Sequence, residues 1–318
     1  MNDIPLPGLI GTHPLGAMAA FGLLRAATQV KSLGEVRLSW QFRPKCHAVL
    51  HTGKACTSDT LVEVLLERQR ARHTANFLNW SDDIKVAPTE FASRVTNITD
   101  REEADFFAAF GSEMVLAPST GDVKPTAFHM TAGQKKFLKS ARELAESLDP
   151  TQLLSARQKP DQRLESCRGA FSEALFGPWR YQDSEHSLGW DPGTEALHAF
   201  SAAAPTDAGP ASVRAAVWLA FESLPLFPCV PVGSRLRTAG FDREGERFVW
   251  PLWNAPISLP VLRSLLTCPQ LFEHPLSAVK LREQGICAVY ASRCVRDANG
   301  KGTLRNALPL LTALEPTD

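Results

Sequence analysis

Residues 219–266 read LAFESLPLFPCVPVGSRLRTAGFDREGERFVWPLWNAPISLPVLRSLL. An apolar run typical of a buried helix leads into a Pro-rich turn, which is followed by a basic strand with Arg235 and Arg237. A charged hairpin then leads to a second strand, which carries Trp250 and Trp253. Arginine and tryptophan on paired strands suit an extended polyanion such as a nucleic-acid backbone, and they suit an ordinary sheet edge equally well.

The composition is that of a globular protein without a basic bias. The chain has 318 residues, of which 44% are hydrophobic, and its 34 Lys and Arg balance its 34 Asp and Glu. A packed core is therefore expected, and any contact with nucleic acid must come from a local patch or from an assembly.

The sequence also bears on location. Seven cysteines form no CxxC pair, and their odd number favours reduced thiols and a cytoplasmic protein. We expect no signal peptide, because Pro5, Pro7 and Gly8 interrupt the N-terminal region. The longest apolar run, at about 15–24, is shorter than the roughly 20 residues of a membrane span, so no membrane partner is expected.

Along the rest of the chain, hydrophobic periodicity predicts alternating groups of helices and strands. Helices are expected at 14–30 after Thr12, 58–73, 101–110 after Asp100, 134–148, 163–176 and 212–224. Strands are expected at 36–42, 46–52, 114–116, 285–296 and 304–313, the first two forming an antiparallel pair, and 76–100 reads as a loop-rich passage. This order predicts an α+β fold with helices packed on mixed or antiparallel sheets.

A segment rich in small residues, SAAAPTDAGP at 201–210, is the best candidate for a flexible connection. It predicts two lobes, an N-terminal α+β domain over 1–200 and a C-terminal α+β domain over 211–318. Gly11, Gly16 and Gly22 lack the spacing of a dinucleotide site, and close helix packing is the better interpretation for them.

No catalytic motif was found among the nucleophile elbow, the HExxH zinc frame, the SxxK frame, the P-loop and paired histidines. The group Cys46, His47, His51 and Cys56 invites a zinc interpretation. However, His47 and His51 would lie about 13 Å apart on one strand, too far to share one zinc ion. Acidic residues could hold magnesium, or could simply face solvent or favour a helix start, at Asp82, Asp83, Asp100, Glu102 and Glu103. We predict no metal and no cofactor.

Basic side chains near aromatic ones are the candidates for nucleic-acid contact, because cations hold phosphates and aromatic rings stack on bases. The predicted binding residues are Arg235, Arg237, Arg243, Lys135, Lys136, Lys139 and Arg180. Two structural alternatives stay open. Trp250 and Trp253 are more simply explained as core residues, and Arg243 could be neutralised within its acidic hairpin.

Three runs resemble a known family. GLIGTHPLGAMAAFGLLRAA at 8–27, HSLGWDPGTEALHAF at 186–200 and the C-terminal run at 235–266 are similar to segments of the large-subunit family of type I (I-G, formerly I-U) CRISPR surveillance complexes. The resemblance implies a non-catalytic DNA-binding and RNA-binding subunit of a Cascade complex in antiviral defence. Its implied partners are other complex subunits, crRNA, target double-stranded DNA and a helicase-nuclease recruited in trans. Its implied role is to help recognition of the flanking motif (PAM) and opening of the target.

Two other functions remain open from the residues alone. One is an α/β enzyme of unrecognised class that works through Asp82, Asp83 or His129. The other is an assembly protein whose arginine and tryptophan patches bind protein.

Overall fold

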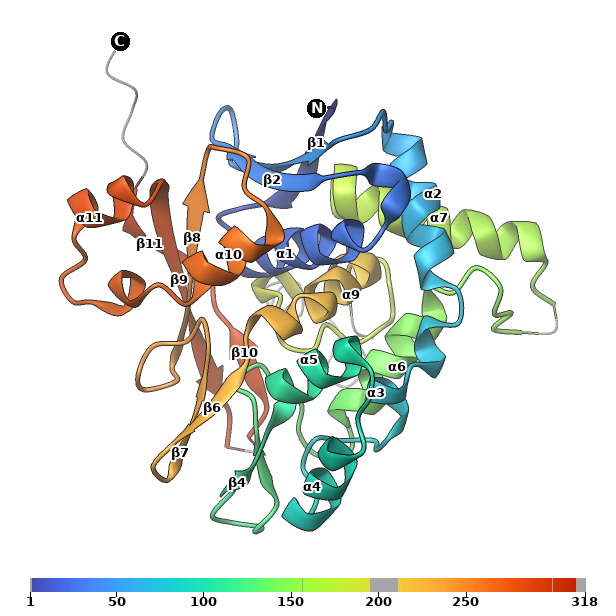
Figure 1. Ribbon diagram of the computed structural model, residues 1–318. Coiled ribbons are helices and arrows are strands. Elements are labelled where there is room, and N and C mark those ends of the chain that lie inside the picture. Colours follow the sequence, from blue (N-terminus) through green and yellow to red (C-terminus); the bar gives the residue numbers. More distant parts are fainter. Residues whose placement is uncertain (1, 156, 195–210, 299, 313–318) are drawn as a thin grey trace, which may run out of the picture.

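The computed structural model describes residues 2–155, 157–194, 211–298 and 300–312 (Figure 1). Helices pack against several small sheets in which the pairings between the described strands are antiparallel, so the predicted α+β class is confirmed. None of the helices in these ranges has the length and apolar run that crossing a bilayer requires.

Two buried helices form the centre of the molecule (Figure 1). Helix α1 (Pro14–Thr28) is buried along nearly its whole length, and α9 (Arg214–Glu222) packs against it. A Cβ atom added at Gly22 would lie 1.7 Å from the carbonyl oxygen of Leu219, which confirms the close-packing interpretation of this glycine. The predicted start of α1 at Thr12 is wrong by one residue, because the side chain of His13 accepts the hydrogen bond from the Gly16 amide.

The N-terminal sheet has the order β1-β3-β2, formed by β1 (Asn2–Ile10), β2 (Val36–Gln41) and β3 (His47–Thr52). The predicted pairing of the second and third strands is confirmed. Strand β1 was not predicted, because Pro5 and Pro7 argue against a strand. Its place at the sheet edge explains why they are tolerated, since an edge strand leaves part of its backbone unpaired.

A group of helices covers the next part of the chain. They are α2 (Ser58–Gln69), η2 (Arg72–Thr74), α3 (Asn76–Asn79), α4 (Pro88–Thr96), α5 (Arg101–Phe110), α6 (Phe137–Ser147) and α7 (Pro160–Phe176). The predicted cap at Asp100 is confirmed by its bond from the Glu103 amide. The loop-rich prediction for 76–100 is wrong, because Pro88 starts a helix and Phe77 stacks on Phe106 with ring centroids 3.9 Å apart.

The other sheets are formed by strands from 111–125 and from the C-terminal part of the chain. Two-stranded pairs are formed by β4 (Gly111–Leu116) with β5 (Val123–Pro125), and by β6 (Cys229–Val232) with β7 (Arg235–Thr238). A four-stranded sheet has β9 (Ile286–Arg296) at its centre, paired with β8 (Arg247–Trp253), β10 (Gly302–Leu304) and β11 (Leu308–Leu311). The predicted last strand is thus two strands. Helices α10 (Leu259–Leu266) and α11 (Ala278–Glu283) and the turns η1 (Lys31–Leu33), η3 (Leu224–Leu226) and η4 (Pro269–Phe272) complete the described elements.

The two tryptophans of the opening stretch belong to the core. Trp250 and Trp253 are buried, and their indole nitrogens donate to the carbonyl oxygens of Gly11 and Leu38, each at 2.8 Å. Strand β8 pairs with β9 and not with β7, so the prediction of arginine and tryptophan on paired strands is wrong. Their burial also excludes stacking of Trp250 and Trp253 on bases, because a buried ring has no free face.

The predicted connection at 201–210 lies outside the described residues. Buried side chains from both sides of it, including Leu24 and Phe221, form one hydrophobic cluster. The described segments of the two predicted lobes, 1–200 and 211–318, therefore share a core.

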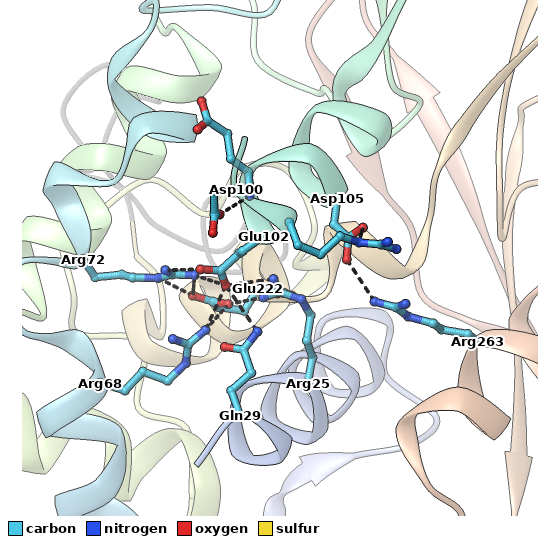
Figure 2. A network of polar contacts seen from close by, with 11 residues as sticks. Arg25, Gln29, Arg68, Arg72, Asp100, Glu102, Asp105, Glu222 and Arg263 are labelled. Carbon is cyan, nitrogen blue, oxygen red and sulfur yellow. Dashed lines mark hydrogen bonds and ion pairs between the residues drawn. The ribbon is translucent and has the colours of Figure 1, made fainter. Parts of the chain in front are cut away.

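A largely buried ion network joins five helical elements, namely α1, α2, η2, α5 and α9 (Figure 2). Glu222 of α9 accepts from Arg25 at 2.6 Å, from Arg68 at 3.1 Å and from Arg72 at 2.8 Å. The same arginines contact Glu102 of α5 at 2.7 to 3.3 Å. In the sequence, Arg68 and Arg72 fall near the end of the helix expected at 58–73, where cations favour the helix dipole. In the fold, their partners are the carboxylates of distant helices.

Candidate functional site

A cleft with a volume of about 670 Å³ lies between β7, the turn at 242–245 and the segment at 124–129. We call it the basic cleft, because most of the charged side chains in its lining are cations. The cations are Lys85, Lys124, Arg235, Arg237, Arg243 and Arg296, and the carboxylates are Asp242 and Glu244.

Local structure places each wall of the basic cleft. Arg235 and Arg237 lie two residues apart on β7, so their side chains leave the same face at about 7 Å from one another. The strand is fastened to the opposite wall by Thr238, whose hydroxyl accepts from the Ala127 amide at 2.9 Å. Lys124 lies on β5, and the pairing of β5 with β4 positions this residue in the wall opposite β7.

The cations of the basic cleft are largely uncompensated. Within the described part of the chain, Arg235, Arg237 and Arg243 form no ion pair. Asp242 is instead bound by Arg247, whose Nε donates to it at 2.8 Å. The prediction that the hairpin could neutralise Arg243 is therefore not supported, and the cleft presents an excess of positive charge that favours anions.

Lys85 and Lys124 likewise have no ion-pair partner among the residues described. Arg296 donates to the carbonyl oxygens of His129, at 3.1 and 3.2 Å, and of Ala127, at 3.4 Å. Carbonyl groups hold this guanidinium in place without cancelling its charge.

A buried Asp–His pair lies behind the cleft wall. Nε2 of His129 lies 2.6 Å from Oδ1 of Asp83, and His129 itself lines the cleft. Burial lowers the pKa of His129, against the opposing attraction of Asp83. Burial would raise the pKa of Asp83, but the hydrogen bond and charge of His129 outweigh it and the pKa is lowered. The hydrogen bond between the two side chains favours the ionised carboxylate of Asp83, whereas burial opposes a charge on His129.

The other predicted binding residues lie outside the lining of the basic cleft. Lys135 lines a separate pocket of about 310 Å³ beside His186, Lys136 precedes α6, and Lys139 lies in the first turn of that helix. Arg180 is paired with Glu173, with Nη2 and Oε2 2.7 Å apart. The structure thus brings together Arg235, Arg237 and Arg243, and it leaves Lys135, Lys136, Lys139 and Arg180 elsewhere.

Sequence reasoning missed Lys85, Lys124 and Arg296. Lys85 and Lys124 are single cations in their segments, and Arg296 shares its strand with Arg293. No pattern in the sequence separates the three from ordinary surface residues. Asp82, which we grouped with Asp83, pairs instead with Arg142.

The residues of the metal hypotheses have other partners. His51 lies between Ser39, at 2.8 Å from Nε2, and Asp3, at 2.7 Å from Nδ1. Nδ1 of His47 lies 2.8 Å from the Lys45 carbonyl oxygen. Among the residues that the structure describes, no three metal-ligating side chains gather at one point.

No protein-family model matches the chain, and neither does any curated protein. The three runs on which the family resemblance rests do meet in the fold. Trp250 donates to Gly11, and Nε2 of His13 lies 3.4 Å from Oδ1 of Asp191. These contacts belong to the core, whereas the third run also contributes the arginines of the basic cleft.

Proposed function

We propose that this protein is a non-catalytic nucleic-acid-binding subunit of a crRNA-guided type I CRISPR (Cascade) complex. The observation that carries the proposal is the basic cleft, in which cations from distant segments converge and Arg235, Arg237 and Arg243 form no ion pair with any described residue. A phosphate backbone is the polyanion that such a group of arginines and lysines binds best. The resemblance of three runs to the large-subunit family supports the membership in such a complex.

The proposed role requires only a few contacts. In crRNA-guided complexes base pairing with the guide reads the target, and the protein recognises the flanking motif and the shape of the duplex. A chain with no net charge can take this role, because six of its cations line one cleft. The proposed partners are the other subunits, crRNA and target double-stranded DNA, with a helicase-nuclease recruited in trans, in the cytoplasm.

Alanine at both Arg235 and Arg237 tests the contribution of the cleft. We expect the assembled complex to bind target DNA more weakly, and the dependence of log K on log salt to become shallower by about two phosphate contacts. The control removes two exposed arginines that have carboxylate partners, Arg70 and Arg168. If the affinity and the salt slope equal those of the unmodified complex, the basic cleft is not part of the binding site.

Copurification from the native operon tests the assembly. The expected result is a complex that contains a guide RNA and repeated backbone subunits. A triple substitution to alanine at Lys135, Lys136 and Lys139 then tests whether the predicted lysines form a second contact, because they lie outside the basic cleft. If the complex assembles but no cation affects DNA binding, the protein is an assembly scaffold.

The Asp83–His129 pair supports a second candidate function, that of an enzyme. A carboxylate that orients an imidazole beside a cleft is the arrangement of a general base. Turnover of a phosphodiester substrate by the isolated protein, lost in Asp83→Ala but kept in Asp82→Ala, would establish the enzyme and overturn the non-catalytic proposal.

A further inference from the structure

The β6–β7 ribbon has two chemically different faces. It is a two-stranded sheet in which Val230 pairs with Arg237 and Val232 with Arg235. Opposite residues of an antiparallel pair have their side chains on the same face. One face of the ribbon therefore consists of two valines beside two arginines.

The second face attaches the ribbon to the body of the protein. Cys229 Sγ lies 3.3 Å from the carbonyl oxygen of Ala109, and Thr238 is buried. Figure 1 shows β6 and β7 extending from the body beside β4. The ribbon is thus held by one face only.

The first face is exposed. Val230 is 52% and Val232 is 45% exposed, and both arginines are exposed and lack ion-pair partners among the described residues. Packing within the described chain does not explain two neighbouring exposed valines at this place. An amphipathic face with uncompensated cations fits a partner that offers negative charge beside apolar surface.

We propose that this face of the β6–β7 ribbon docks into the major groove of a DNA duplex, an inference that rests on the proposed nucleic-acid-binding function. The major groove of B-form DNA is about 12 Å wide and admits a two-stranded β-ribbon. Arg235 and Arg237 bind phosphates or guanine edges, and the valines contact deoxyribose and thymine methyl groups. The remaining cations of the basic cleft, such as Lys124 and Arg243, hold the adjacent backbone.

The geometry distinguishes DNA from RNA. An RNA duplex takes the A form, whose major groove is deep and narrow and does not admit side chains or a ribbon. The same cations still attract RNA through its phosphates. A preference for the DNA duplex therefore depends on the groove contacts of the ribbon, whereas general affinity depends on charge alone.

The test measures fluorescence anisotropy of the full-length protein with a short DNA duplex and with an RNA duplex of the same sequence. We expect the DNA duplex to bind at least about tenfold more tightly. Val230→Ser with Val232→Ser should weaken DNA binding by about tenfold through lost apolar contact and leave RNA binding unchanged. Val261→Ser, at a valine of α10 that is also 45% exposed, is the matched control, and thermal melting verifies that each variant folds.

Three results would overturn the inference while the proposed function stands. They are equal binding of the two duplexes, unchanged DNA binding by the valine variant, and tighter binding of a single strand than of the duplex. Displacement of the DNA by polyglutamate at equal charge would point to an acidic protein partner and overturn it as well. If neither the protein nor the assembled complex binds any nucleic acid, the proposed function itself is wrong.

Discussion

Among single residues, the buried Glu222 is notable because its carboxylate contacts three arginines. Burial would raise the pKa of this carboxyl, but the charges of Arg68, Arg72 and Arg25 outweigh burial and lower it to about 2. The pKa of Glu102 is lowered for the same reason, against the effect of burial and mainly through Arg72. Each carboxylate compensates the charge of arginines that would otherwise be buried without a counter-ion.

Glu222→Gln is expected to lower the free energy of unfolding by about 3 to 5 kcal/mol. The substitution keeps the shape of the side chain but leaves three buried arginines with Glu102 alone. Urea denaturation measures the loss. Glu67→Gln is the matched control, because Glu67 is 73% exposed and pairs only with Arg70, so a change within about 0.5 kcal/mol is expected.

The carboxyl of Glu222 makes the free energy of unfolding depend on pH in the acid range. Its pKa is lower in the folded state than the ordinary value of 4.5, so the unfolded chain binds the proton more readily. Its contribution is therefore complete above about pH 5 and is lost as the pH falls toward 2. Unfolding curves across this range should show a smaller loss in Glu222→Gln than in the unmodified protein, and parallel curves would contradict this assignment.

At the scale of elements, the contact between α1 and α9 depends on a glycine. A Cβ atom at residue 22 would overlap the backbone of Leu219, so the two helices approach more closely than a residue with a side chain would permit. Ordinary helix propensity disfavours glycine in this place, and packing outweighs it.

Gly22→Ala is expected to destabilise the protein by about 3 kcal/mol or more, because a backbone atom cannot move aside without separating the helices. Gly169→Ala is the control within another helix, α7. Nothing lies within 4 Å of its Cβ position, so alanine should be neutral or stabilise by up to about 1 kcal/mol. Thermal melting compares the two, and equal midpoints would show that the helices can separate freely.

At the scale of the whole molecule, segments from both sides of 195–210 contribute to one hydrophobic cluster. Buried tryptophans lie on both sides as well, with Trp40 and Trp190 before this segment and Trp218, Trp250 and Trp253 after it. A shared core couples the two predicted lobes.

We therefore expect a single unfolding transition. Tryptophan fluorescence, which reports on side chains from both lobes, should change at the same denaturant concentration as far-UV circular dichroism. Two resolved transitions would instead indicate that 1–200 and 211–318 fold independently, as two separate lobes would.

Local patterns in the sequence were enough to predict the α+β class, the pair of strands at 36–52 and the helix capped by Asp100. These features depend on periodicity and on capping, which act between residues close in the chain. The charges of Arg235, Arg237 and Arg243 singled out three residues of the basic cleft. The burial of Trp250 and Trp253 and the contact of Arg68 with Glu222 became evident in the folded chain alone. The tertiary structure also brought Lys85, Lys124 and Arg296 to the same cleft. Such contacts join segments that are distant in the sequence, and packing of the whole chain, which no local pattern records, places them together.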